Sequence, residues 1–352
     1  METTPRDRPI GACTAPSLQF RDAIDARDSS ALQPCGDLTT GGERLTRQCG
    51  QTGDPRLDVA ALDRTVLPLD PKTREHIGAI ARYGVTLQRN PRAFGLVGDS
   101  MTVAPAFLGA FSANVRGPTR PHVLASELGA TLEPIVDFYR GAKVQQIGGA
   151  WRDSFRALRA AKVGKRAEWA VTGGEHSPIG MMISDISPAV AVVLFGGNDA
   201  ASRMLPPEQV AAVFGKNLER VIDALENQGV VPILNTVARH GLHPGIDDCG
   251  PLSEMSDWRI AVHTNAVSAQ VVEIACRRKL PLIDLRAAMD TAFNRGLGHD
   301  GVHPSLYVEG SGVLTARGLQ CGHNVRNYVT LRMLQQVVAA LRSSWLPGGY
   351  RE

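Results

Sequence analysis

The sequence predicts an α/β fold in which helices cover both faces of a mostly parallel sheet. Short apolar segments of strand length, each closed by glycine or polar residues, alternate along the chain with longer segments of helical periodicity. The strand-length segments are apolar throughout, which is typical of parallel strands buried on both faces. Open sheets of this kind bind ligands beyond the carboxyl ends of their strands, so functional residues are expected there.

Four segments have the composition of such strands. Residues 93–97 come first and are closed by a glycine, and residues 189–195 form a continuous apolar run that also ends in glycine. Residues 230–234 and 280–285 repeat the pattern. The intervals between them are long enough for the crossover connections that parallel strands require.

Helices are predicted before, between and after these strands, at residues 72–88, 207–227, 258–278 and 324–341. A shared face is predicted for four residues of the first helix, Ile77, Ile80, Tyr83 and Leu87. A further helix is predicted directly after Ser100, with Pro105 in its first turn, where a missing N–H is tolerated.

Length and composition place the chain among soluble globular proteins. Of its 352 residues, 43% are hydrophobic and 21% are charged, which excludes collagen, coiled coil and general disorder. No run approaches the roughly 18 apolar residues that a membrane-spanning helix needs.

The charge pattern favours neither nucleic acid nor an anionic membrane as the main partner. The formal net charge is +3, from 38 basic and 35 acidic residues that are interspersed along the chain. The one compact basic run, Arg277-Arg278-Lys279, ends a predicted helix, where cations match the helix dipole. We interpret it as a solvated helix end rather than a binding patch.

Residues 1–62 are poor in large apolar side chains and are predicted to be an irregular, cysteine-containing leader before a single domain at residues 63–348. The 6 cysteines show no spacing suited to zinc, so no structural metal is expected. An even number suits disulfides in an exported protein, yet residues 1–15 lack the apolar core of a secretion signal. Either a signal has been removed or the protein stays inside with free thiols.

The first motif with chemical potential, Gly98-Asp99-Ser100, lies between a predicted strand and a predicted helix. Ser100 would stand at the amino end of that helix, where its backbone N–H and the helix dipole favour a developing negative charge. The simpler interpretation is that Ser100 only caps the helix, and for an isolated Gly-Asp-Ser that interpretation is preferred.

The second motif, Gly196-Gly197-Asn198-Asp199, ends the most apolar strand. The amide of Asn198 can donate an N–H to an oxyanion without titrating, and Asp199 is expected to cap the next segment. Taken alone, a Gly-Asn pair after a strand is more often merely a turn.

The third motif, Asp300-Gly301-Val302-His303-Pro304, lies in a loop. Three residues apart on a turn, Asp300 and His303 can approach so that the carboxylate holds one ring nitrogen while the other faces a serine. Pro304 keeps His303 out of the helical conformation. His299 is the local rival, but it is adjacent to Asp300 and lacks that turn; a solvated loop histidine is the plain alternative.

Together the three motifs outweigh the plain interpretation of each. At average residue frequencies, all three in this order arise by chance in about one chain in ten thousand. No Gly-x-Ser-x-Gly elbow, His-Glu-x-x-His, phosphate-binding Gly-Lys-Ser/Thr or Gly-x-Gly-x-x-Gly sequence is present. The joint signal is therefore specific in type.

The three motifs resemble blocks one, three and five of the SGNH hydrolases, also called the GDSL esterases and lipases, and the resemblance spans about residues 63–345. It implies a flavodoxin-like three-layer αβα sandwich with Ser100 as nucleophile, His303 as general base and acid, and Asp300 as the orienting carboxylate. It also implies an oxyanion hole made by the backbone N–H of Ser100, a backbone N–H of the block-two glycine and the side chain of Asn198. Residues 324–330 look like a bacterial subset of this family.

Block two has two candidate glycines. Gly164, within residues 154–169, stands where that bacterial subset carries it and is favoured over Gly149. Neither is followed by the usual serine or threonine, which leaves the third oxyanion donor less well matched than the serine.

The resemblance implies hydrolysis of a carboxylic ester through an acyl-Ser100 intermediate, without metal or cofactor. Small-molecule or glycan esters of short acyl groups, acetyl on carbohydrate first, are the expected substrates. Tyr307 and Trp151 are candidate sugar-stacking residues, although core packing is the preferred interpretation of Trp151. A lipid esterase, lysophospholipase or thioesterase shares every catalytic residue, and a non-catalytic binding module is the alternative of another class. No nucleic-acid partner is expected, the oligomeric state is left open, and the resemblance and cysteine number favour an extracellular or periplasmic location.

Overall fold

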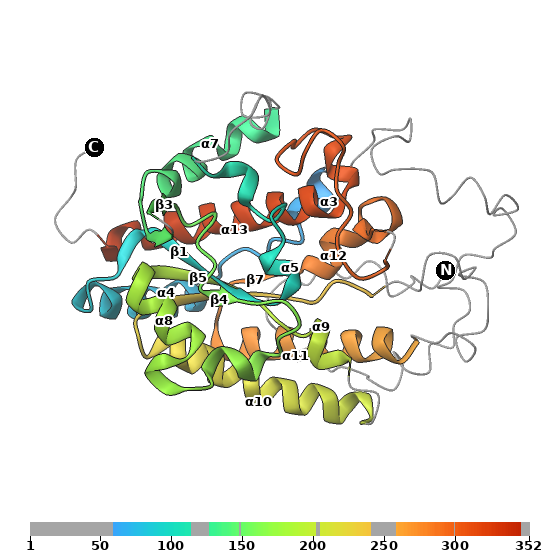
Figure 1. Ribbon diagram of the computed structural model, residues 1–352, viewed down its shortest axis with the longest axis horizontal. Helices are drawn as coiled ribbons and strands as arrows, with labels where there is room; N and C mark the ends of the chain where they lie inside the picture. Colours follow the sequence, from blue (N-terminus) through green and yellow to red (C-terminus); the bar gives the residue numbers. More distant parts are fainter. Residues whose placement is uncertain are drawn as a thin grey trace, which may run out of the picture.

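The structure is a computed structural model, and it describes residues 59–113, 127–147, 149–201, 205–240, 258–298 and 300–345. At its centre is a five-stranded sheet in which every neighbouring pair of strands is parallel. The strands are, in spatial order, β4 (Ala160–Ala161), β1 (Asn90–Gly98), β5 (Pro188–Leu194), β6 (Val231–Asn235) and β7 (Leu282–Ile283). The sheet runs through the middle of the molecule (Figure 1).

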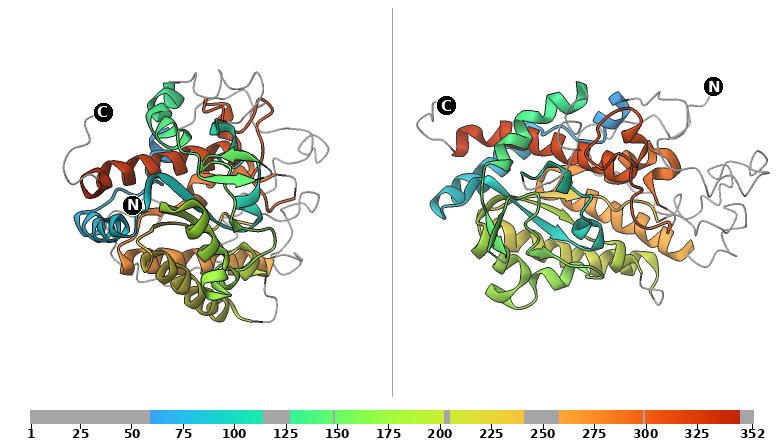
Figure 2. Two further views of the ribbon diagram at one scale, coloured as in Figure 1. Left: turned by 60° about the vertical axis from the view of Figure 1, so that its left-hand side comes forward. Right: turned by 45° about the horizontal axis from the view of Figure 1, so that its top comes forward.

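Helices cover both faces of this sheet, and two further views show the same layers (Figure 2). One layer consists of α8 (Pro178–Ile186), α10 (Pro207–Glu226) and α11 (Trp258–Arg278). The other consists of α4 (Pro71–Thr86), α7 (Glu127–Arg140), α12 (Leu285–Asp290) and α13 (Gly322–Trp345). The shorter elements are α3 (Val59–Asp63), α5 (Ser100–Val103), α9 (Gly197–Ala200), the hairpin β2 (Gln145–Ile147) and β3 (Ala150–Arg152), and the 3-10 turns η3 (Gly109–Phe111), η4 (Ala167–Val171), η5 (Gly174–His176), η7 (Phe293–Gly296) and η8 (Gly318–Gln320).

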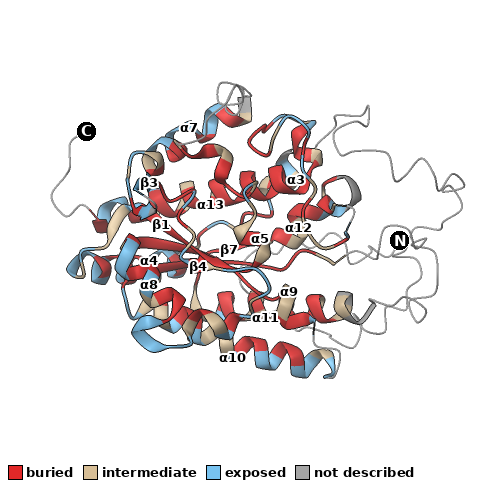
Figure 3. Cartoon of the chain, viewed as in Figure 1, coloured by how far each residue is buried: buried red, intermediate tan, exposed pale blue. Residues whose placement is uncertain are grey.

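The strand order places the candidate site. The chain passes from β1 to β4 on one side of it and then returns past β1 to β5 on the other, so the direction of winding reverses between β1 and β5. At such a reversal the connections diverge and leave an uncovered position at the carboxyl ends of the two strands. Every residue of β5 is buried, and the sheet is buried along most of its length (Figure 3).

The predicted α/β fold with a parallel sheet between helical layers is confirmed. The face predicted for the first helix is partly wrong, because Tyr83 in α4 is 49% exposed. Ile77 and Ile80 are buried together with Ala81 and Gly84 instead. Gly84 lies so near the turn before β6 that a Cβ on it would stand 2.3 Å from the carbonyl oxygen of Gly229. The helix therefore packs through its small residues at this end.

The helix predicted after Ser100 is also shorter than expected. α5 has four residues and ends at Val103, so Pro105 lies beyond it and not in its first turn. Ala104 has extended backbone angles, φ −50° and ψ 124°, as the residue before a proline favours. The segment from 280 to 285 contains only a two-residue strand, and its last residue, Leu285, already begins α12.

The leader predicted at residues 1–62 lies outside the described residues except for its end. Residues 59–62 belong to α3, and Leu62 is fully buried. At the end of α3, Asp63 Oδ1 accepts hydrogen bonds from the Tyr328 hydroxyl at 2.8 Å and from Arg332 Nε at 3.2 Å, both on α13. The division into a leader and a domain stays a prediction.

Two of the cysteines are described, Cys276, buried in α11, and Cys321, which is buried and disulfide-bonded. Cys13, Cys35, Cys49 and Cys249 lie outside the described residues. In the part of the chain that the structure describes, no helix is long and apolar enough to cross a membrane.

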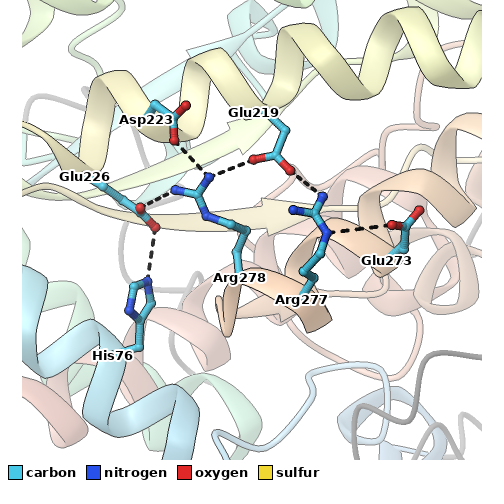
Figure 4. Close-up of polar contacts among 7 residues, drawn as sticks. All are labelled: His76, Glu219, Asp223, Glu226, Glu273, Arg277 and Arg278. Carbon is cyan, nitrogen blue, oxygen red and sulfur yellow. Dashed lines mark hydrogen bonds and ion pairs between the residues drawn. The ribbon is translucent and has the colours of Figure 1, made fainter.

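Two residues of the basic run, Arg277 and Arg278, form ion pairs (Figure 4), so the predicted solvated helix end is only partly right. Arg278, whose side chain is 23% exposed, contacts three carboxylates of α10, those of Glu219, Asp223 and Glu226. Arg277 also reaches Glu219, and its side chain is 53% exposed. His76 of α4 contacts Glu226 at 3.2 Å, so the network joins two helices of one layer to a helix of the other.

We expect Arg278→Ala to lower the free energy of unfolding by about 1 to 3 kcal/mol, because three acidic side chains of one helix lose their shared, partly buried cation. Urea unfolding monitored by circular dichroism measures the change. Arg277→Ala is the matched control and should lower it by less than about 1 kcal/mol, since the Arg277 side chain is more exposed. Equal losses in the two variants would contradict this account of the network.

Candidate active site

Ser100 stands at the carboxyl end of β1, where the strand passes directly into α5. The Asp99 side chain caps this helix, since its Oδ1 accepts the N–H of Met101 at 3.0 Å. A Cβ on Gly98 would stand 2.2 Å from Thr102 Oγ1, so only glycine lets α5 fold back so closely onto the strand. Among the described residues, no acceptor bonds the backbone N–H of Ser100, the first residue of α5.

The structure brings Ser100, His303 and Asp300 together. His303 Nε2 lies 3.0 Å from Ser100 Oγ, and His303 Nδ1 lies 2.7 Å from Asp300 Oδ2. These contacts require a proton on Nδ1 and leave Nε2 to accept the serine hydroxyl. The order hydroxyl, imidazole, carboxylate is the one that base-activated serine chemistry requires. The rival His299 lies outside the described residues.

The turn that carries His303 is held by Asp300 itself. Asp300 Oδ1 accepts the N–H of Val302 at 3.0 Å and the N–H of His303 at 2.9 Å, while Oδ2 contacts the ring. Partial burial raises the pKa of Asp300, but the two backbone N–H donors and His303 outweigh it, so the pKa lies below its ordinary value. The side chains of His303 and Asp300 are 45% and 43% exposed, so the pair opens to solvent.

The first turns of α13 connect the serine segment to the histidine loop. On the histidine side, the backbone N–H of Gly322 donates to Ser305 Oγ and that of His323 to the Ser305 carbonyl. On the serine side, the amide of Asn327 accepts the N–H of Leu108 at 2.8 Å and donates to the Ala106 carbonyl at 2.9 Å. Two parts of the site that lie about two hundred residues apart in the sequence are therefore fixed to one helix.

Arg326 of α13 is the one charged residue of this helix turn, and it is fully buried behind α5. Its guanidinium donates to the Met101 carbonyl and to Thr102 Oγ1, and it lies 3.5 Å from the centre of the Phe107 ring. Burial lowers its pKa to about 9, and the nearby Asp99 carboxylate acts in the opposite direction. In the sequence, residues 324–330 indicate only a similarity to a bacterial subset of the family, and no local pattern places Arg326 near the serine.

Asn198 lies in α9, directly after β5, the strand that pairs with β1. Its Nδ2 donates one hydrogen bond to Asp99 Oδ2 at 3.1 Å and another to the Lys165 carbonyl at 3.2 Å. Gly196, two residues before Asn198, has φ +126°. A Cβ on Gly196 would stand 2.6 Å from Val237 and from Val267, so this turn requires glycine. The amide thus reaches the cap residue next to Ser100.

Of the two candidate block-two glycines, Gly164 is the one whose loop contacts Asn198. Gly164 follows β4, which pairs with β1, and it directly precedes Lys165. Its φ is +73°, and no heavy atom lies within 4 Å of the place of a Cβ. Gly149, with φ +79°, instead forms the turn of the separate β2–β3 hairpin.

Asp199 does not cap the following segment as expected. It lies in the first turn of α9, is 8% exposed, and accepts the backbone N–H of Ala167 in η4, at 3.3 Å and 3.4 Å from its two oxygens. Burial raises its pKa from 3.8 to about 6, although the Ala167 N–H and Arg166 act in the opposite direction. The side chain joins the Asn198 loop to the chain beyond β4.

This pKa gives a stability prediction. In the unfolded chain Asp199 releases its proton near pH 3.8 and in the folded chain near pH 6, so the folded state loses stability as pH rises across that interval. Asp199→Asn removes the titration and can still accept the Ala167 N–H. We therefore expect the variant to gain up to about 3 kcal/mol relative to the wild type between pH 4 and pH 7 in urea unfolding. A difference between the two proteins that does not change with pH would contradict the assignment.

In the described ranges, no group of three His, Cys, Asp or Glu side chains is placed to hold a metal ion. No curated protein matches the sequence. The model of the GDSL-like Lipase/Acylhydrolase family matches residues 96–307, which begin in β1 and contain Ser100, Gly164, Asn198, Asp300 and His303. The match covers more than half of the chain and includes the serine, the amide and the imidazole described above, and the chain therefore belongs to the GDSL-like lipase/acylhydrolase family of carboxylic ester hydrolases.

Proposed function

We propose that this ester hydrolase works through an acyl-Ser100 intermediate, with His303 as general base and acid and Asp300 as the carboxylate that orients the imidazole. The observation that carries the proposal is the continuous contact from Ser100 Oγ to His303 Nε2 and from His303 Nδ1 to Asp300 Oδ2. In this arrangement the serine proton has an acceptor, and the imidazolium that forms lies against a carboxylate.

The reaction follows from these contacts in two halves. In acylation, Ser100 Oγ attacks the ester carbonyl carbon while its proton passes to His303 Nε2; His303 then gives that proton to the leaving alcohol as the ester C–O bond breaks. In deacylation, water attacks the acyl carbon and its proton passes to His303. The carboxylic acid leaves, and the proton returns from His303 to Ser100 Oγ.

The negative charge that develops on the ester carbonyl oxygen needs hydrogen-bond donors to stabilise it. The backbone N–H of Ser100 at the amino end of α5 is the first, and the Asn198 amide and the backbone N–H of Gly164 are the others that we propose. Support comes from the loop after β4, where the Lys165 carbonyl is within hydrogen-bond distance of Asn198. Preorganised donors of this kind contribute roughly 10²- to 10³-fold each to kcat.

We expect a fluorophosphonate to label Ser100, because the probe reacts with a serine hydroxyl whose proton has a base at hand. Intact mass and peptide mapping of the labelled protein measure the reaction. Labelling should disappear in Ser100→Ala and slow at least 100-fold in His303→Ala, while Ser112→Ala, a buried serine bonded to Asp153, serves as the control that keeps it. A folded chain that hydrolyses no ester and takes no label would instead favour a non-catalytic binding module.

For the substrate, we propose esters of short acyl groups, in particular acetyl, on carbohydrate. The half-exposed side chains of His303 and Asp300 support this, since a large hydrated alcohol can reach the imidazole without first losing its water. Of the two aromatic residues considered for sugar stacking, Trp151 on β3 is 47% exposed, whereas Tyr307 is buried against Val313 and Cys321 and offers no stacking face.

A lipid ester is the second candidate, and three exposed apolar side chains in the loops of the site favour it. Val163, next to Gly164, is 63% exposed, and Leu306 and Val308, shortly after His303, are 56% and 73% exposed. Apolar side chains exposed to this extent would be covered by an acyl chain.

A panel of esters separates the two substrate classes. We expect kcat/KM to be highest for acetylated sugars and to fall with acyl length on a common aryl alcohol, because the site opens to solvent beside His303. Val308→Ser should then change kcat/KM for acetyl esters less than about twofold. Values that rise with acyl length, and fall at least tenfold for long chains in Val308→Ser, would assign the protein to lipid esters.

A further inference from the structure

The amide of Asn198 is already engaged when no substrate is present. Both of its N–H groups have acceptors, Asp99 Oδ2 at 3.1 Å and the Lys165 carbonyl at 3.2 Å. A side-chain amide has two N–H donors, so an oxyanion can receive one only if one of these bonds is given up or shared. The question is which of the two acceptors yields.

The two acceptors, Asp99 Oδ2 and the Lys165 carbonyl oxygen, differ in chemical type and in how firmly the surrounding structure holds them. Asp99 is an acidic side chain with the Arg326 cation near it, and its ionised form accepts hydrogen bonds roughly twice as strong as those between neutral groups. The Lys165 carbonyl is neutral and belongs to a loop in which Gly164 has open space around it. A developing oxyanion therefore replaces the Lys165 carbonyl more easily than it replaces Asp99.

Asp99 is also held rigidly. It is 2% exposed, and its second oxygen, Oδ1, caps α5 through the N–H of Met101. Burial raises the pKa of Asp99, and the Met101 N–H and the fully buried Arg326, which is bonded to the Met101 carbonyl, act in the opposite direction. The two oxygens of Asp99 thus have separate partners: one fixes the helix that carries Ser100, and the other fixes the amide of Asn198.

From these contacts we infer that Asp99 is a positioning residue, which aims the Asn198 amide so that one N–H stays on Asp99 Oδ2 while the other exchanges the Lys165 carbonyl for the oxyanion. The inference rests on the proposed function, because it gives the proposed oxyanion donor its orientation. It also explains why an aspartate precedes the serine when serine or asparagine would cap the helix equally well.

Asp99→Asn separates capping from positioning. The new amide can accept the Met101 N–H or bond Asn198 through its oxygen, but it cannot do both, and its nitrogen otherwise faces the Asn198 nitrogen donor to donor. We expect kcat to fall about 10- to 100-fold with KM within about twofold, because the interaction lost is made in the transition state. Asp70→Asn is the matched control: Asp70 caps α4 through Thr73 and should keep the wild-type kcat.

The decisive measurement is a double-mutant cycle with Asn198→Ala. That variant alone should lower kcat by roughly 10² to 10³. If Asp99 acts through Asn198, adding Asp99→Asn to Asn198→Ala lowers kcat by less than about threefold further. The same full loss in both backgrounds, or no loss from Asp99→Asn alone, overturns the inference. Thermal unfolding checks that each variant is folded. The cycle is repeated with Asp99→Ser, whose shorter side chain can still cap α5 but does not reach the Asn198 amide.

A measurement on the unchanged sequence covers the case in which no variant at 99 folds. The side-chain amide protons of Asn198 are followed by ¹⁵N NMR before and after Ser100 is labelled with the fluorophosphonate, whose phosphoryl oxygen occupies the oxyanion position. One proton signal should keep its position and the other should shift. Two shifted signals, or none, contradict the inference. Absence of both labelling and ester hydrolysis would count against the proposed function instead, so the two failures are distinguishable.

Discussion

The geometry of the site depends on the buried hydrogen bonds that the first turns of α13 make in two directions. Asn324 and Asn327 are fully buried, and between them their amides bond backbone groups of the serine segment and of the chain after His303. A buried polar group left without its partner costs about 1 to 3 kcal/mol, so moving either segment relative to α13 would break these bonds at that cost. The distance between Ser100 and His303 depends on these bonds, because the two side chains come from segments about two hundred residues apart.

The two aspartates next to the reacting groups lie in opposite environments. Asp99 is buried, and desolvation raises its pKa although Met101, Arg326 and Asn198 act against it. Asp300 is half exposed, and its bonds from backbone N–H groups and His303 hold its pKa below the ordinary value. Asp300 therefore lies at the solvent-exposed rim beside His303, whereas Asp99 is buried with the guanidinium of Arg326 near it. Two carboxylates of one site can serve different tasks because their surroundings differ.

The sequence predicted the larger part of the fold and much less of what surrounds the serine. The long helices and the strand of residues 189–195 were predictable, because each has a clear apolar period or run along its whole length. The two-residue strand β4 was not predicted, and the helix after Ser100 was predicted too long, since β4 and the end of α5 follow from packing against β1 rather than from their own composition. Tyr83 shows the same limit of prediction from sequence. The helical period was right, but Gly84 approaches Gly229 closely, and the buried face includes Gly84 and not Tyr83.

The sequence by itself determined which chemical groups are present and in what order. The strand order of the folded sheet then places the loops after β1 and β5 next to each other. Local spacing even specifies the contact between Asp300 and His303, because three residues on a turn suffice to close it. Only the tertiary structure decided that Arg326 bonds the serine helix and that the Asn198 amide has both of its donors engaged. Gly164 was already favoured over Gly149 from the sequence, and the contact of its loop with Asn198 is seen only in the structure. These are contacts between residues far apart in the chain, and no local pattern records them, because a buried polar group takes its partner from whichever segment packing brings within reach.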